Sequence, residues 1–317
     1  MYDRGQILAC ATAMSNPEKN TTTLPHHSVL HREGPGFAVT VLPASPYEVN
    51  YVPAHHVIGF TFEKQRGVDA FGGSRRRIFD AEPWRLAFTP AGCDVFSTSE
   101  RGGEYLLLSV APETFARHAS GTVRGRLPQI TNVADPLFTP LAIGLRRAAM
   151  LGAAAPLAIE TLVAAAVERI SAVLDAGRVR AKPERRMTSW RLKRIYDHFE
   201  ARLAEEIQLA DIASDIGLSE SYLARAFRAA TGTTLHAALL ERRIARARRL
   251  IEAALRHNAP ASLADVAAAT GFSSHAHMTT AFRRVLGVTP SGWMRMVRAT
   301  RRERSQTFSR ETPKSDL

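Results

Sequence analysis

The stretch LADIASDIGLSESYLARAFRAATGTT, from Leu209 to Thr234, recurs as LADVAAATGFSSHAHMTTAFRRVLGVTP, from Leu263 to Pro290. The two Leu-Ala-Asp openings lie 54 residues apart (263 − 209), and Gly217 and Gly271 have the same separation (271 − 217). A repeat of this kind indicates that one structural unit is used twice.

The first copy predicts a short helix, a tight turn and a second helix. Its apolar residues recur at helical spacing up to Gly217, which can adopt the positive φ that ends a helix. Ser219 is placed to cap the next helix, whose buried positions are Leu223 and Phe227. A short helix, a glycine turn and a capped second helix together predict a helix-turn-helix.

The second copy repeats each of these elements. Gly271 makes the turn, and either Ser273 or Ser274 caps the helix that follows. Met278 and Phe282 form the buried pair of that helix. One match to this pattern would be weak, but two tandem matches are a specific signal for two helix-turn-helix units.

The outward faces of the two second helices predict what these units bind. Short polar side chains near a helix start can reach base edges in a major groove, an arginine can pair with guanine, and trailing arginines suit phosphates. A merely solvated face usually carries acidic residues too, and after Glu220 neither face has one. The outward residues are Ser221, Tyr222, Ala224, Arg225 and Arg228 in the first copy, and His275, Ala276, His277, Thr279, Thr280, Arg283 and Arg284 in the second.

The segment between the copies predicts one long helix, from Leu239 to His257. Nineteen residues (257 − 239 + 1) at about 1.5 Å each give roughly 28 Å. That length is close to one duplex turn of about 34 Å, so two recognition helices could enter successive major grooves. The spacing therefore favours double-stranded DNA as the ligand.

The positive charge is concentrated in the same region. The chain has a formal net charge of +12, and residues 182–304 hold 22 Lys/Arg against 12 Asp/Glu, a difference of +10. The remainder holds 20 and 18 (42 − 22 and 30 − 12), a difference of only +2. Basic charge confined to one region is typical of a polyanion-binding domain, although a solvated helical surface could also carry it.

The N-terminal half has a sequence pattern typical of β-strands. The runs FAVTVL, VIGFTFE, WRLAFT and YLLLSV between residues 37 and 110 predict short strands separated by turns, which favours a small barrel or an antiparallel sandwich. Such a barrel could hold one small ligand or fill itself with side chains. Residues 136–176 then predict a helical hairpin, whose alanine-rich second helix either packs on the barrel or forms a subunit interface.

Composition suggests the domain boundaries. We expect a flexible leader over residues 1–34, a barrel with its hairpin over 35–180, a basic linker over 181–189, a DNA-binding domain over 190–300 and a flexible tail over 301–317. No run is apolar enough to span a bilayer, and no secretory signal is evident, so a cytoplasmic protein without membrane contact is expected.

No motif predicts a metal, a cofactor or a catalytic group. Cys10 and Cys93 are too few for a thiolate zinc site. His55 and His56 are adjacent, so they would point to opposite faces of a strand, and the histidine and glutamate spacing of a metal-binding cupin is missing. The cluster from Arg75 to Arg77 is either a solvated loop face or a contact for an acidic effector or another protein.

Residues 190–298 resemble the DNA-binding domain of the AraC/XylS family of bacterial transcription regulators. The residues that carry the resemblance are the doubled Leu-Ala-Asp-(Ile/Val)-Ala, the two turn glycines, Leu223-x-Arg225-x-Phe227, Arg243-Ile244-x-x-Ala247-x-x-Leu250-Ile251, Gly271-Phe272-Ser273-Ser274, Ala281-Phe282-Arg283-Arg284 and Gly287-Val288-Thr289-Pro290. They cover about a third of the chain. Leu235 departs from the family's usual proline, Trp293 from its tyrosine and Thr280 from its arginine.

The resemblance implies an α+β multidomain chain, with an N-terminal cupin-like β-barrel and helical hairpin that sense an effector and dimerise, and a C-terminal all-α domain with two helix-turn-helix units. The implied partners are double-stranded DNA, RNA polymerase, a small-molecule effector and a second copy of the chain. The implied base-reading residues are Ser221, Ala224, Arg225, His275, Ala276, His277, Thr279 and Thr280, and we expect Arg228, Arg283 and Arg284 at phosphates.

Three functions compete at this point. The first is an effector-responsive transcriptional regulator, expected to be an activator and not an enzyme. The second is a cupin-type enzyme attached to a DNA-binding domain, for which metal in the purified protein would be required. The third is a ligand-independent regulator whose barrel only dimerises, which would not be stabilised by any small molecule.

Overall fold

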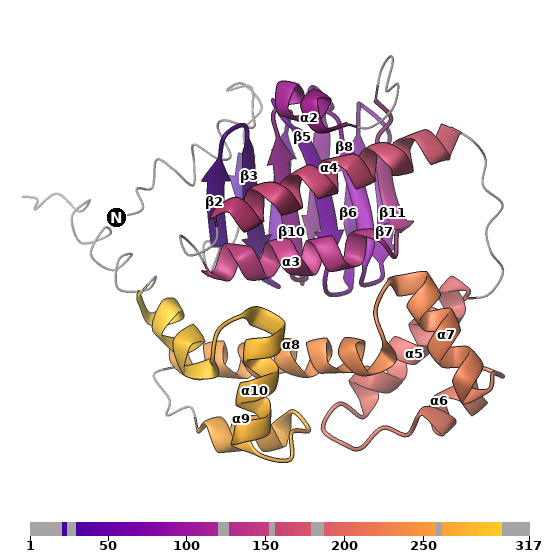
Figure 1. The fold of residues 1–317 in the computed structure, drawn as a ribbon, viewed down its shortest axis with the longest axis vertical. Coiled ribbons are helices and arrows are strands. Elements are labelled where there is room, and N and C mark those ends of the chain that lie inside the picture. The colour runs from indigo at the N-terminus through magenta and orange to yellow at the C-terminus, as the bar shows by residue number, and fades with distance from the viewer. Residues whose placement is uncertain are drawn as a thin grey trace, which may run out of the picture. The chain divides into compact units, whose positions relative to one another are not determined.

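The computed structural model describes residues 21–23, 30–119, 127–151, 156–178, 187–257 and 262–299 (Figure 1). The tail predicted over 301–317, most of the predicted leader and residues 181–186 of the predicted linker lie outside these residues. The chain divides into two compact units. One comprises Met1–Arg194 and Leu218–Leu235, and the other comprises Ile195–Gly217 and His236–Leu317.

The strands of the first unit form two antiparallel sheets. The six-stranded sheet has the order β11-β8-β5-β10-β3-β2. Its strands are β11 (Ile130–Ala134), β8 (Arg85–Thr89), β5 (His56–Thr61), β10 (Tyr105–Val110), β3 (Phe37–Leu42) and β2 (Leu30–Gly34). The five-stranded sheet has the order β1-β4-β9-β6-β7. Its strands are β1 (Thr21–Thr23), β4 (Tyr47–Tyr51), β9 (Val95–Ser99), β6 (Gln65–Phe71) and β7 (Arg77–Ala81).

Each of these sheets keeps its own edge strands, β11 and β2 in one and β1 and β7 in the other. Of the barrel and the antiparallel sandwich predicted here, the barrel is therefore corrected to two sheets in the described part of the chain, since a closed barrel would need the strands to pair all the way round. The predicted leader is also corrected in part. Residues 21–23 pair with β4, and residues 30–34 pair with β3, so both segments gain ladder hydrogen bonds.

Three helices accompany the six-stranded sheet: α2 (Pro112–His118), α3 (Phe138–Leu151) and α4 (Pro156–Arg178). In Figure 1, α3 and α4 run across one face of the strands. The rings of Phe60 on β5 and Phe138 on α3 lie 5.7 Å apart, and those of Phe88 on β8 and Phe115 on α2 lie 5.6 Å apart. The helices and one face of this sheet therefore form the apolar core.

The apolar core and a cavity lie on opposite faces of the six-stranded sheet, as the strand register shows. Leu106 pairs with Val41 and Phe60, so these fully buried side chains share the helix-covered face. Leu107 pairs with Gly59, and both line a cavity of about 430 Å³ between the two sheets. Because side chains alternate along a strand, one sheet supplies the core with one face and the cavity with the other.

The two adjacent histidines have structural roles. The Nδ1 of His56 accepts a hydrogen bond from the backbone N–H of Ala91 at 3.1 Å, and its ring stacks on Phe88 with centroids 5.7 Å apart. The Nδ1 of His55 lies 3.2 Å from the Oγ of Ser109. These contacts bind the β5 strand to its surroundings. Among the described residues, no group of three or more His, Cys, Asp or Glu could hold a metal ion.

The remaining described chain is helical. The helices are α5 (Ser189–Ala201), α6 (Leu209–Asp215), α7 (Glu220–Thr231), α8 (Leu235–Arg256), α9 (Leu263–Ala269) and α10 (His275–Leu286), followed by a helical segment over 290–299. The helix α7 belongs to the same compact unit as the two sheets. Within that unit, the hydroxyl of Thr139 donates a hydrogen bond to the carbonyl oxygen of Thr231 at 2.6 Å. No helix in the described ranges is both long and apolar enough to cross a membrane.

Candidate nucleic-acid interface

The helix α7 begins at the cap that the sequence predicts and ends at a glycine. The Oγ of Ser219 accepts a hydrogen bond from the backbone N–H of Tyr222 at 3.4 Å, so this serine is the N-cap. Gly232 ends the helix in the left-handed region (φ +75°), where its N–H bonds to the carbonyl of Arg228. Leu223 and Phe227 are buried, as expected from their i, i+4 spacing. The opposite face is therefore presented outward.

The helix α10 has the same construction, and here the structure decides between two candidate caps. The Oγ of Ser274 accepts from the backbone N–H of His277 at 3.1 Å, so Ser274 is the N-cap. The Oγ of Ser273 instead lies 3.1 Å from the Nδ1 of His277, and the His277 ring packs edge-on against Phe272. These two contacts orient the imidazole. Gly287 ends the helix with φ +80°.

The structure places ten of the eleven predicted contact residues on exposed surface. On α7 these are Ser221, Ala224, Arg225 and Arg228, and on α10 they are His275, Ala276, His277, Thr280, Arg283 and Arg284. Thr279 differs, because it is half-buried and its hydroxyl is buried without a hydrogen-bond partner among the described residues. Its place in the helix favours packing over an outward contact.

The exposed faces of α7 and α10 are almost free of negative charge. Glu220 is the first residue of α7 and its one carboxylate, and α10 has none. Arg228 lies in the last turn of α7, and Arg283 and Arg284 lie in the last turn of α10. Exposed arginines without neighbouring carboxylates on the same helix suit a polyanion such as a phosphate backbone.

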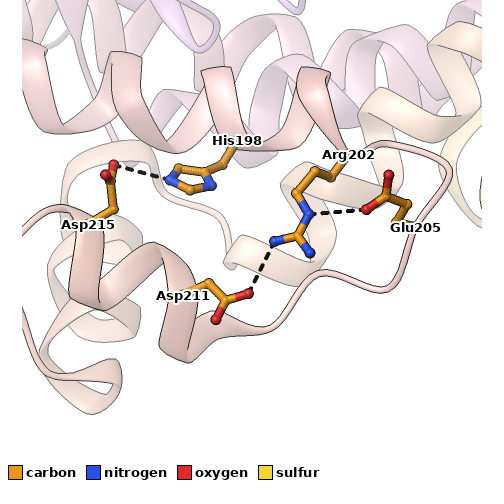
Figure 2. A network of polar contacts seen from close by, with 5 residues as sticks. All are labelled: His198, Arg202, Glu205, Asp211 and Asp215. Carbon is orange, nitrogen blue, oxygen red and sulfur yellow. Dashed lines mark hydrogen bonds and ion pairs between the residues drawn. The ribbon is translucent and has the colours of Figure 1, made fainter.

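Sequence reasoning missed a polar network between α5 and α6, shown in Figure 2. Arg202 donates from Nε to Glu205 and from Nη1 to Asp211, both at 3.1 Å, and His198 lies 3.1 Å from Asp215. The hydrogen bonds that Arg202 donates to Glu205 and Asp211 raise the pKa of its guanidinium. The aspartate of the first Leu-Ala-Asp opening thus holds α6 against α5.

Several arginines of α8 are internal rather than free for a ligand. Arg243 donates to the carbonyl oxygens of Leu203 at 3.0 Å and Glu205 at 2.7 Å, and burial lowers its pKa. The guanidinium of Arg242 lies over the Tyr196 ring, and that of Arg248 lies over the Trp293 ring. Part of the positive charge counted from sequence therefore stabilises the helical region itself.

The helix α8 begins earlier than predicted, at Leu235, and runs for 22 residues to Arg256. At 1.5 Å per residue this is about 33 Å, close to one turn of a DNA duplex. Leu235 occupies the first helical position, where proline is favoured because the missing N–H has no helical partner. Leu235 is 4% exposed, so its buried apolar side chain stabilises the start of the helix where a proline ring would do so by its rigidity.

Short helices, glycine turns and capped helices with outward basic faces define a helix-turn-helix protein of the DNA-binding class. Residues 212–296 match a family described as a helix-turn-helix domain. HTH-type transcriptional regulator GlxA of Rhizobium meliloti (strain 1021) is 33% identical over 101 residues, which are 32% of this chain and 30% of that protein. The chain thus covers less than a third of that relative's length. Residues 212–296 therefore form a helix-turn-helix domain, and part of the chain is similar to a transcriptional regulator.

Two solved structures resemble part of the chain. One is a transcriptional regulator with an AraC-type DNA-binding domain from Chromobacterium violaceum, with 31% identity, covering 35% of this chain and 91% of that chain at a TM-score of 0.30. The other is the DNA-binding domain of AdpA, solved in complex with a target DNA, with 28% identity, 35% and 95% coverage and a TM-score of 0.31.

Proposed function

We propose that this chain is a sequence-specific, non-enzymatic DNA-binding transcriptional regulator. Two helix-turn-helix units, α6 with α7 and α9 with α10, would each insert their second helix into a major groove. The observation that carries the proposal is the pairing of two capped helices whose outward faces are basic and free of carboxylates beyond Glu220. The 22-residue α8 between them matches one duplex turn in length.

The two recognition helices would read different half-sites. We assign base contacts to Ser221, Ala224, Arg225, His275, Ala276, His277 and Thr280, and phosphate contacts to Arg228, Arg283 and Arg284. Thr279 is assigned to packing because its hydroxyl is buried. Since Arg225 can donate two hydrogen bonds to guanine, the first half-site should contain a guanine whose replacement is costly.

The N-terminal region would serve as a cupin-like sensor. Its two antiparallel sheets fit a double-sheet jelly roll, and the cavity between them is large enough for a small effector. We propose a sensor over 35–180 extended by β1 and β2 from the leader 1–34, a linker over 181–189, a DNA-binding domain over 190–300 and a tail over 301–317. The outer side of α4, where Leu157 is 76% exposed, would contribute to a homodimer.

The regulator would act in the cytoplasm, where its DNA is, and would activate transcription through contact with RNA polymerase. A reporter assay decides the direction of this effect. Expression from a promoter carrying the binding site should rise when the protein is supplied. A fall in expression on the same promoter would make it a repressor.

Selection from a random duplex library tests DNA recognition directly, because the protein itself chooses the sequences that it binds. We expect two conserved boxes about one helical turn apart. Arg225→Ala should flatten the base preference at one position and weaken binding by about 1–3 kcal/mol. Arg147→Ala, which removes an arginine that is also exposed but lies on α3, is the matched control and should leave the consensus unchanged. An unchanged consensus for Arg225→Ala would refute the assigned face.

Salt titration separates phosphate contacts from base contacts. Each of Arg228→Ala, Arg283→Ala and Arg284→Ala should weaken binding to all duplexes alike and reduce the slope of log affinity against log salt by about 1. A slope equal to that of the unmodified protein would place that arginine away from the backbone of the duplex.

A further inference from the structure

The cavity between the two sheets has walls of defined chemistry. It is lined from one side mainly by β5, β8 and β10 and from the other by β4, β6, β7 and β9, and most of its surface is apolar. Leu107, Val57 and Ala87 line it from the six-stranded sheet, while Val49 and Val95 line it from the other. An apolar lining of this size is typical of a small-molecule site.

The charged side chains at the cavity are already paired. Asp69, whose side chain is 8% exposed, accepts a hydrogen bond from the Nε of Arg77 at 2.7 Å. Asp80 pairs with Lys64 at 3.2 Å, and Arg85 also has an interaction partner. A charged ligand would therefore enter an apolar cavity without a free counter-ion, and burying an uncompensated charge is strongly unfavourable.

Three phenols are among the uncharged polar side chains of the lining, which also include Gln65 and Thr89. The hydroxyl of Tyr47 lies 3.2 Å from the Oγ of Ser97. The hydroxyls of Tyr51 and Tyr105 have no hydrogen-bond partner among the described residues, and both side chains line the cavity. Burial raises the pKa of Tyr51 to about 12 and raises that of Tyr105 further, so both stay protonated at neutral pH. They are available as neutral donors.

Glycine at position 59 makes room for one of these phenols. A Cβ built on Gly59 would lie 1.7 Å from the hydroxyl oxygen of Tyr105, so any other residue would displace the ring. The strand pairing of Tyr105 with Thr61, and of Leu107 with Gly59, sets this hydroxyl against the floor of the cavity. The fold therefore fixes the position of the Tyr105 hydroxyl.

We propose that the cavity binds an uncharged, largely apolar small molecule whose oxygen atom accepts hydrogen bonds from Tyr51 and Tyr105. An aromatic or alicyclic alcohol, phenol or ketone has this chemistry. Anions and cations of the same size are excluded because Asp69 and Arg77 neutralise each other. The proposal deepens the sensor role proposed above and rests on it.

Three probes of equal shape test the charge preference: 2-naphthol, 2-naphthoate and 2-naphthylmethylammonium, titrated into the full chain at pH 7 by calorimetry. We expect 2-naphthol to bind at least tenfold more tightly than either ion. Equal affinities, tighter binding of an ion, or no binding of 2-naphthol by folded protein would overturn the proposal. Binding of the selected duplex, measured on the same sample, reports on the DNA-binding function separately.

Variants locate the site and its charge balance. Tyr51→Phe and Tyr105→Phe should each weaken 2-naphthol binding about two- to tenfold, the range for one hydrogen bond. Leu107→Trp should fill the cavity and abolish binding, while duplex binding persists. Asp69→Asn should free Arg77 and strengthen 2-naphthoate binding several-fold without strengthening that of 2-naphthol. Unchanged affinities in all four variants would place the probe elsewhere and refute the assigned cavity.

Discussion

The two turn glycines offer a matched test of how differently the repeats are built. Both adopt positive φ, +65° at Gly217 and +77° at Gly271. A Cβ at Gly217 would meet no atom within 4 Å. A Cβ at Gly271 would lie 2.6 Å from the carbonyl oxygen of Leu203 and 2.9 Å from the Nη2 of Arg243. The same substitution should therefore have unequal costs in the two copies.

The expected magnitudes follow from these surroundings. Gly217→Ala carries only the cost of a left-handed conformation, about 1–2 kcal/mol. Gly271→Ala carries that cost and also displaces Leu203 or Arg243, whose 3.0 Å hydrogen bond involves a charged donor worth about 1.5–3 kcal/mol. The sum is a loss of roughly 2.5–5 kcal/mol in the free energy of unfolding.

Asparagine separates the two contributions, because it tolerates the left-handed conformation but carries a Cβ. Gly217→Asn should cost less than about 1 kcal/mol, while Gly271→Asn should keep most of the steric loss of about 1.5–3 kcal/mol. Urea unfolding followed by far-UV circular dichroism measures all four variants, with unchanged m-values as the check on a common unfolding reaction. Equal losses for the two alanine variants, or full recovery in Gly271→Asn, would refute the reasoning.

Three further predictions concern stability. Glu104→Gln should destabilise the sheet unit by about 3–5 kcal/mol in urea, since it removes a carboxylate that lies 3.2 Å from the buried guanidinium of Arg146; a loss below about 1 kcal/mol would contradict this. Ser274→Ala should cost about 0.5–2 kcal/mol by removing the N-cap of α10, and the neighbouring Ser273→Ala should cost less; the reverse order would reassign the cap. Burial lowers the pKa of His56, so the unfolded chain binds its proton more readily and stability should fall as pH drops below about 6.5. His56→Gln should flatten that fall in pH-dependent melting curves, and an unaltered pH profile would assign it to other groups.

The helical region was predictable because its signals are local. A glycine with positive φ, a serine cap and buried residues at i, i+4 depend on a few neighbouring residues, so Gly217, Ser219, Leu223 and Phe227 could be placed from sequence. The choice between Ser273 and Ser274 could not, because both hydroxyls are within reach of His277 and only the folded structure distinguishes a backbone bond from a side-chain bond.

The sheets were predictable only in part, for a physical reason. The four strands recognised as apolar runs, β3, β5, β8 and β10, are the inner strands of the six-stranded sheet. Their faces meet either the helices or the cavity, so apolar residues occur at successive positions. The strands β4, β6 and β9 carry polar residues on both faces, as in the segment VFSTS of β9, and present no such run. Apart from β7, which directly follows β6 and pairs with it, their partners lie far along the chain.

The repeated helix-turn-helix pattern and the basic charge beside it were evident from the order of the residues alone. The first property depends on residues that lie close together in the chain, and the second depends only on how many charged residues a segment holds. Tertiary structure alone decided which arginines remain outward, since Arg243 and Arg248 are held internally while Arg225 is exposed. It also decided that Tyr51 and Tyr105 line one cavity, because the cavity lies between two sheets and each sheet supplies one of these residues.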